Sequence, residues 1–227
     1  MGRPFVPLGA LLALLLVGPV VVAAQDATPA ATATTGEGAA GPARTDARYF
    51  LPYGPGGLNA GLAVTANESG VCAHGSLATP GRPDAWDCLG TDDNTVRDPC
   101  FADPFAAPGA PHELACAAAP WAADVVLLRL TEPLSRAKDG APAAAGVEEA
   151  DPGPWELPWA LELANGERCT LLTGASVVLA GERLHYGCEG GGWVLGGPDR
   201  AEAVWTVSYL AGGAVATTLV DVAVAWA

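Results

Sequence analysis

Six cysteines constrain the fold of this chain more than any other feature of its sequence. Their number is even and no two of them form a Cys-x-x-Cys pair, which argues against thioredoxin-like redox sites and zinc ribbons. A cystine framework in an oxidising compartment is the natural interpretation. We favour pairs of neighbours in sequence, because each would close a loop of about fifteen to twenty residues and contribute roughly 3 kcal/mol. The expected pairs are Cys72–Cys88, Cys100–Cys116 and Cys169–Cys188.

The N-terminus predicts export from the cell. Arg3 precedes an apolar run over residues 8–24, and the small residues that end this run offer a signal-peptidase site before Gln25. A Gly-Pro interruption at residues 18–19 suits a signal-peptide core better than a membrane-spanning helix, which needs about 20 apolar residues. We therefore expect a signal peptide over residues 1–24 and a secreted, extracytoplasmic mature protein. The alternative is an uncleaved segment that anchors the chain in a membrane.

The charge of the chain limits its possible partners. The formal net charge is -14, from 11 Lys and Arg against 25 Asp and Glu, and the basic residues form no cluster. Nucleic acids and anionic membrane surfaces attract such clusters, so we expect no nucleic-acid partner and no membrane contact beyond an uncleaved signal segment. A single lysine among many Ala, Gly and Pro residues is typical of a GC-rich bacterial genome.

Composition also predicts how the chain is divided. Residues 25–47 are rich in Ala, Thr, Gly and Pro and lack apolar periodicity, so we expect a disordered tether that buries too little surface to offset its ordering entropy. A single extracytoplasmic domain is expected over residues 48–227, where the first aromatic residues of the mature chain appear. Its first half is dense in turn residues, with strand candidates at 61–66 and 124–130.

The second half of the expected domain predicts β-hairpins. Residues 159–164 alternate between one apolar face and a face of small or charged residues. Asn165-Gly166 then gives a strong hairpin signal, because both residues tolerate positive φ. Further turns are expected at residues 180–182 and 212–213. No amphipathic helix of about ten residues or more is found. We therefore expect a mainly β fold, a small antiparallel sandwich or barrel with a loop-rich, disulfide-stapled N-terminal half.

Two sequence patterns suggest a family. Residues 84–101 contain D-A-W-x-C followed by N-x-V-x-D-P-C-F, and residues 159–169 contain W-x-x-x-L-A-N-G-x-x-C. Both resemble patterns in an uncharacterised family of exported, cysteine-containing domains from actinobacteria and related GC-rich bacteria. Similar regions form the extracytoplasmic part of some membrane-anchored proteins, including kinases. The resemblance covers roughly residues 70–197 and implies export, but it brings no activity and no site.

Acidic and amide side chains gather in the turn-rich first half. Asp84, Asn94 and Asp98 are candidate binding residues there, and Asp87 lies between them in sequence. Carboxylate and amide oxygens are the ligands that calcium prefers, but the spacing is not that of an EF-hand. Asp and Asn are also the usual residues of Asx-turns and caps. We favour this structural interpretation and predict neither a metal ion nor a cofactor.

Seven tryptophans raise the possibility of a carbohydrate-binding surface, because exposed aromatic faces stack on sugars. Trp86 and Trp193 lie in loop-like contexts and are the candidates for such a role. Covering a small core is the commoner function of tryptophan. Trp193, which follows three glycines, is the residue that we would test first.

No catalytic motif is evident in the sequence. Ser76 lies near His74 but is not in a Gly-x-Ser-x-Gly elbow, so a loop-capping hydroxyl is the favoured interpretation. No two histidines have the spacing of a helical zinc site. We therefore favour a non-enzymatic domain that binds an unknown envelope or extracellular ligand or partner. The alternatives are a secreted hydrolase of envelope polymers that uses acids such as Asp84 and Asp98, and a purely structural surface protein.

Overall fold

The computed structural model describes residues 41–107, 112–134, 155–174, 176–179 and 181–227. The expected signal segment and residues 25–40 of the expected tether lie outside them. Strand β1 (Asp46–Arg48) begins in the last two residues of the segment expected to be tether. Thr45 before it is buried, and its hydroxyl donates to the Val222 carbonyl. Regular structure therefore begins before residue 48, where the first aromatic residues led us to expect the start of the domain. No helix within the described residues is long and apolar enough to cross a membrane.

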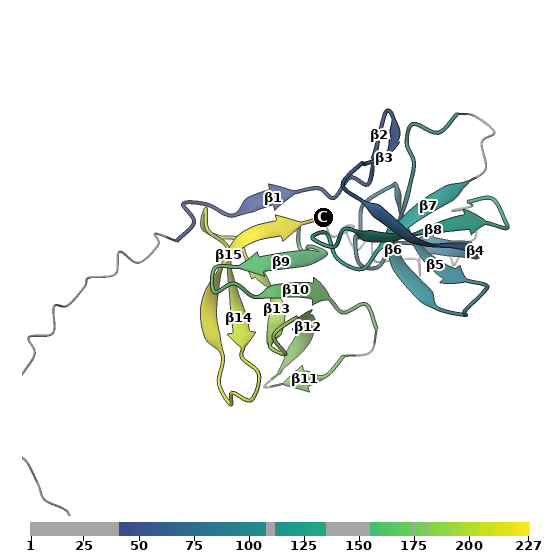
Figure 1. Cartoon of the computed structure of the whole chain (residues 1–227). Coiled ribbons are helices and arrows are strands. Elements are labelled where there is room, and N and C mark those ends of the chain that lie inside the picture. The colour runs from purple at the N-terminus through teal and green to yellow at the C-terminus, as the bar shows by residue number, and fades with distance from the viewer. Residues whose placement is uncertain (1–40, 108–111, 135–154, 175, 180) are drawn as a thin grey trace, which may run out of the picture. The chain divides into compact units, whose positions relative to one another are not determined.

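The mainly β fold class is confirmed, and the first half of the folded region is a closed barrel (Figure 1). Consecutive strands of this first barrel pair antiparallel, and its last strand, β8, pairs with its first, β4, in parallel. A meander with an odd number of strands can close only through such a parallel pair. The strands are β4 (Ala63–Gly75), β5 (Ala85–Gly90), β6 (Val96–Ala102), β7 (Glu113–Ala117) and β8 (Asp124–Leu130).

Strand β4 closes the first barrel because it is long enough to pair twice. Its first part pairs with β8 and its second part with β5, and Gly70 belongs to both pairings. A Cβ at Gly70 would lie 2.7 Å from the Leu128 side chain and from the Leu89 carbonyl oxygen. Only glycine allows this close approach, so Gly70 fixes the point at which three strands meet.

The second half forms another closed barrel. Its strands are β9 (Ala160–Leu163), β10 (Arg168–Leu171), β12 (Glu182–Cys188), β13 (Trp193–Asp199), β14 (Thr206–Leu210) and β15 (Thr218–Trp226). Antiparallel pairing of β15 with β9 closes the ring. Strand β1 adds in parallel to β15, and the short β11 (Val178–Leu179) pairs with β12. A small separate hairpin joins β2 (Tyr53–Gly54) to β3 (Gly57–Leu58).

The predicted hairpin turns of the second barrel are confirmed. The β9–β10 turn contains Gly166 at φ 89°, the β11–β12 turn contains Gly181 at φ 87°, and the β14–β15 turn contains Gly213 at φ 77°. These left-handed conformations are open to glycine at little cost, which is why the turn residues could be recognised in the sequence.

The predicted disulfide pairing is also confirmed, and each bond links adjacent strands. The two cysteines of each pair lie directly opposite one another in the ladder, in β4 and β5, in β6 and β7, and in β10 and β12. The bonds are Cys72–Cys88, Cys100–Cys116 and Cys169–Cys188. Cysteines of the first two bonds pack with Trp86, Leu114 and Leu128 in the core of the first barrel.

Residues of both barrels share one further core cluster, built around Phe50, Phe101 and Trp159. The buried guanidinium of Arg82 lies 4.5 Å from the centre of the Phe101 ring. It donates to the main-chain oxygens of Phe50 and Ala227 at 2.7 and 2.9 Å. Arg82 therefore links the first barrel to the last strand of the second.

Candidate functional site

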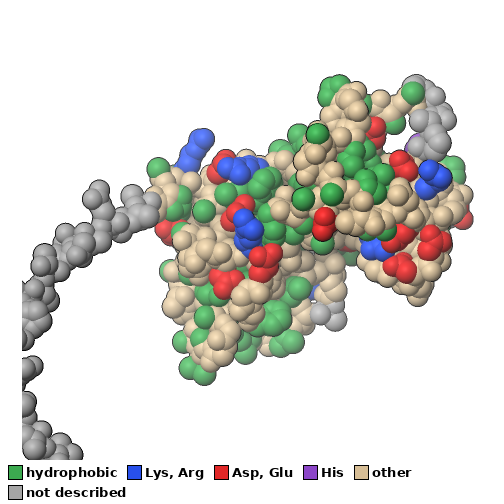
Figure 2. Space-filling view, in the orientation of Figure 1, with side chains coloured by type: hydrophobic (Ala, Val, Ile, Leu, Met, Phe, Trp, Pro, Cys, Tyr) green, Lys and Arg blue, Asp and Glu red, His purple; other side chains and the backbone are tan. Residues whose placement is uncertain are grey.

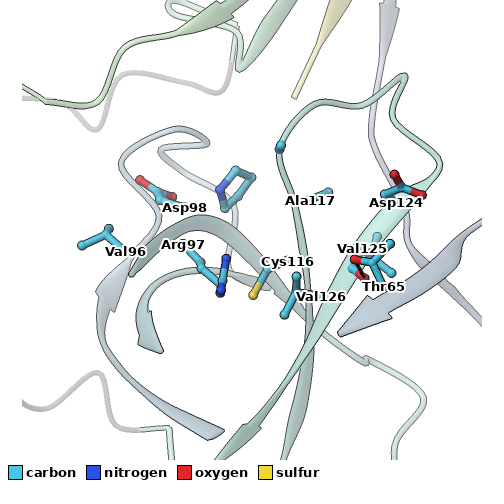
Figure 3. A pocket seen from close by; sticks show the side chains of 11 residues that line it. Thr65, Val96, Arg97, Asp98, Cys116, Ala117, Asp124, Val125 and Val126 are labelled. Atoms are coloured by element: carbon cyan, nitrogen blue, oxygen red, sulfur yellow. Dashed lines mark hydrogen bonds between the residues drawn. The ribbon is translucent and has the colours of Figure 1, made fainter. Parts of the chain in front are cut away.

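A pocket of about 430 Å³ opens at the end of the first barrel where β4, β6 and β8 begin and β7 ends. We call it the mouth pocket. Figure 3 shows Asp98 and Val96 on one side of it, Asp124, Val125 and Thr65 on the other, and Cys116 with Ala117 between them. Its lining residues are Thr65, Val96, Arg97, Asp98, Pro99, Cys116, Ala117, Ala118, Asp124, Val125 and Val126. The volume lies within the range of small-molecule sites, and barrel mouths are common places for them.

Small side chains explain why the mouth pocket is open. The strands contribute valine, alanine and proline, where larger side chains would fill the barrel end. Leu114 and Leu128 in the core of the first barrel are completely buried and do not line the pocket. The pocket is therefore a shallow chamber over a packed interior, and it does not run through the barrel.

The charge of Arg97, the basic residue of the lining, is already neutralised. Its guanidinium donates to both carboxylate oxygens of Glu68, at 2.6 to 2.9 Å, and to Asp93 at 2.8 Å. Two carboxylates thus surround one guanidinium, in the forked geometry that Arg prefers. This network joins β4 to β6 beyond the end of the short β5.

The Asp98 carboxylate organises the loop that follows β4. It accepts hydrogen bonds from the Ser76 hydroxyl at 2.5 Å and from the main-chain amides of Leu77 and Ala78 at 3.0 and 3.1 Å. The Ser76 hydroxyl in turn accepts from the Thr79 amide. Ser76 therefore caps a loop, as the sequence indicated. Burial raises the pKa of Asp98 above its usual range, while the bond from Ser76 opposes this shift.

A second carboxylate, Asp87, lies close to Asp98. The pairing of β5 with β6 shifts register so that one residue, Asp87, stands opposite both Asp98 and Pro99. Burial raises the pKa of Asp87, and the charge of His74 on the neighbouring strand β4 opposes the shift. The negative charge of Asp87 in turn raises the pKa of Asp98. Sequence reasoning placed Asp87 in the acidic segment but did not predict this pair, because a β-bulge leaves no clear signal in one sequence.

The other acidic and amide candidates have structural roles elsewhere. Asp84 accepts two hydrogen bonds from Arg82, at 3.0 and 2.5 Å, and it does not line the mouth pocket with Asp98. Asn94 is exposed in the β5–β6 turn at φ 57°. Beside it, Asp93 accepts a bond from the Thr95 amide, which is the Asx-turn chemistry that the sequence favoured. Among the described residues, no group of three or more His, Cys, Asp or Glu is arranged to hold a metal ion.

The two tryptophan candidates are not part of the mouth pocket. Trp86 is 4% exposed and packs inside the first barrel, so its face is not available to a sugar. Trp193 lies in β13 of the second barrel and is 39% exposed. Its ring lies 3.7 Å from the position of a Cβ at Gly187, so it covers a glycine on the neighbouring strand. Of the five residues singled out from the sequence, Asp98 alone lines the mouth pocket.

Comparisons with known proteins add no relatives to this description. No protein-family model matches the chain, and neither curated proteins nor solved structures show a significant similarity to it.

Proposed function

We propose that this chain is an exported binding domain without catalytic activity, and that the mouth pocket holds its ligand or partner outside the cytoplasm. The observation that carries the proposal is the pocket itself, an open chamber with an apolar floor and a few polar groups at its rim. Such preformed sites bind by burying apolar surface and orient the ligand through the polar groups.

The polar groups near the pocket are already hydrogen-bonded within the protein, which favours binding over catalysis. A general acid or base must exchange its proton with a substrate, and it must reach the reacting atom. Asp98 in β6 instead accepts three hydrogen bonds from the loop that follows β4, and Ser76, its hydroxyl partner, is buried. Substitution of Asp98 or Ser76 would therefore disturb the structure of this loop, which is the effect expected of structural residues.

Three features support a location outside the cytoplasm. All six cysteines are paired in disulfides, which persist in oxidising compartments. The apolar run over residues 8–24 has the form of a signal peptide. The resemblance of residues 84–101 and 159–169 to exported bacterial domains agrees with both.

The Asp87–Asp98 pair favours a second candidate function, a secreted hydrolase of envelope polymers. Such an enzyme uses two neighbouring carboxyl groups, one of which has a raised pKa and acts as general acid, and burial raises the pKa of both Asp87 and Asp98. Asp87 lines a separate cavity of about 230 Å³ together with His74 and Val96, so a substrate has access to it. This pair takes the place of the Asp84–Asp98 pair expected from the sequence.

Equilibrium sedimentation with purified bacterial cell-wall polymer distinguishes the two functions. We expect saturable binding without release of soluble fragments. The variant Ala118→Trp, which fills the mouth pocket, should weaken binding at least about tenfold. The matched variant Ala214→Trp, at an exposed alanine of the β14–β15 turn, should bind as the natural chain does. Release of fragments that stops in Asp87→Asn would instead establish the hydrolase.

A further inference from the structure

We propose that the mouth pocket recognises an organic ammonium group, with its alkyl portion on the apolar floor and its N–H groups on the carboxylates at the rim. This inference rests on the proposed binding function and names the chemistry of the ligand. Recognition in the mouth pocket depends on the hydrogen-bonding positions that the lining residues still have free after their own contacts are made.

The rim offers acceptors. A carboxylate has about four acceptor positions, and Asp98 uses three of them, one at Oδ1 and two at Oδ2. Asp124 stands on the opposite side of the pocket and is exposed (Figure 3). No hydrogen bond or ion pair to its carboxylate is found in the part of the chain that the structure describes. Asp98 therefore has one acceptor position left and Asp124 has all of its own, so each can accept from a donor-rich group in the pocket.

The same lining is poor in donors. The Thr65 hydroxyl donates to the Val125 carbonyl at 3.2 Å, and the Arg97 guanidinium is held by Glu68 and Asp93. The Arg97 network contributes one positive and two negative charges, so it adds to the negative potential of the rim. A phosphate or carboxylate ligand would therefore meet repulsion without a compensating donor.

The net negative charge of the chain also favours a cationic ligand over an anionic one. Figure 2 shows Lys and Arg side chains scattered singly or in small groups among Asp and Glu on the face in view. The whole chain has a formal net charge of -14. A cationic ligand is drawn toward such a surface, and binding should weaken as salt screens the attraction.

The apolar lining adds a requirement for an apolar body. Val96 on one side of the pocket and Val125 on the other contribute branched side chains, as does Val126, and the Cys116 sulfur lies between the two sides. A bare metal cation would leave this surface wet and would find only two carboxylates, fewer oxygens than calcium takes. An alkyl chain that ends in an ammonium group satisfies the floor and the rim together.

Three probes of equal chain length test the inference: n-butylammonium, n-butanol and butyrate, each titrated into the folded, disulfide-bonded protein at neutral pH. We expect n-butylammonium to bind at least about tenfold more tightly than the other two. Asp124→Asn should weaken its binding about tenfold, and the exposed control Asp221→Asn in the second barrel should leave it unchanged. Thermal unfolding of both variants checks that the fold is intact.

Two further arms identify the source of the ammonium group. Tighter binding of Nα-acetyl-lysine methylamide than of cadaverine would point to a lysine side chain of a peptide, and the reverse order to a free amine. Equal binding of n-butanol or butyrate, or full binding by Asp124→Asn, would overturn the ammonium inference. If the probes bound equally well to the natural chain but not to Ala118→Trp, the pocket would still be a binding site, although not one specific for ammonium groups. Absence of binding by all the probes would count against both proposals.

Discussion

At the residue scale, the charged side chains of the first barrel act in pairs that span strands and loops. Arg97 holds Glu68 and Asp93 across the end of β5, Arg82 holds Asp84, and Asp98 holds the loop that begins at Ser76. The sequence indicated Asp84 and Asp98 as turn or binding residues. The Glu68 partner of Arg97 and the Ser76 partner of Asp98 could not be predicted, because folding of the barrel brings together residues that are far apart in the chain.

Arg82 is the residue whose loss should cost the most stability. Arg82→Ala removes hydrogen bonds to two main-chain oxygens, and it leaves the Phe50 oxygen and the partly buried Asp84 carboxylate without this donor, while the Ala227 oxygen keeps its bond from the Phe50 amide. We expect the free energy of unfolding to fall by about 3 kcal/mol. Urea denaturation measures the change. The control Arg129→Ala removes a side chain that is 71% exposed, and it should change stability by less than about 0.5 kcal/mol. An equal effect of both variants would contradict the role assigned to Arg82.

The raised pKa of Asp87 predicts how stability depends on pH. Burial disfavours the charged form in the folded protein, so this carboxyl favours folding most at pH values below its ordinary pKa of 3.8. That contribution is lost as the pH rises through the higher pKa of the folded state. At pH 7, Asp87→Asn should therefore be more stable than the natural chain, and the difference should vanish in acid. Urea denaturation at several pH values tests this. A variant less stable at pH 7 would show that the attraction to His74 outweighs burial.

At the scale of the element, turns could be predicted and irregular strands could not. The hairpins at Gly166, Gly181 and Gly213 combine positive φ with flanking apolar alternation, and both leave a pattern in the sequence. Strands β5, β6 and β7 lack that pattern. They are short and rich in cysteine and small or polar residues, β5 and β6 shift register, and β6 contains Pro99. Burial on both faces and two disulfides stabilise these strands. Neither effect produces the alternation of apolar and polar residues by which a strand is recognised in a sequence.

Substitution of Gly70 tests whether β4 pairs with both β5 and β8 at this residue. Gly70→Ala places a methyl group 2.7 Å from Leu128 and from a main-chain oxygen, so we expect a loss of about 1–3 kcal/mol. Gly61→Ala adds the same methyl group where no atom lies within 4 Å. It should leave the midpoint of thermal unfolding nearly unchanged. If Gly70→Ala were tolerated equally well, the close approach at this point of the barrel would be wrong.

At the scale of the whole molecule, two barrels, each with its own internal disulfides, share a core cluster and are joined by the contacts of Arg82. The sequence predicted the cystine pairing and the β class, but it did not predict two closed barrels or the pocket. Closure depends on which strand pairs with the first one, and a single sequence carries no direct signal for that choice. The mouth pocket depends on the same closure, because its lining comes from four strands.

The proposed export has a direct readout. Mass spectrometry of protein secreted from a bacterial host should show an N-terminus near Gln25 and no free thiols. A retained Met1 would establish an uncleaved segment in place of a signal peptide. Reduced cysteines in the secreted protein would contradict the three disulfides.

Amide NMR spectroscopy of the folded protein with a library of small polar and apolar fragments can show whether the mouth pocket is a binding site. We expect chemical-shift changes that cluster at the amides of Val96, Ala117 and Val126, and that disappear in Ala118→Trp but persist in Ala214→Trp. Shifts that scatter over both barrels, or that survive filling of the pocket, would contradict binding at this place.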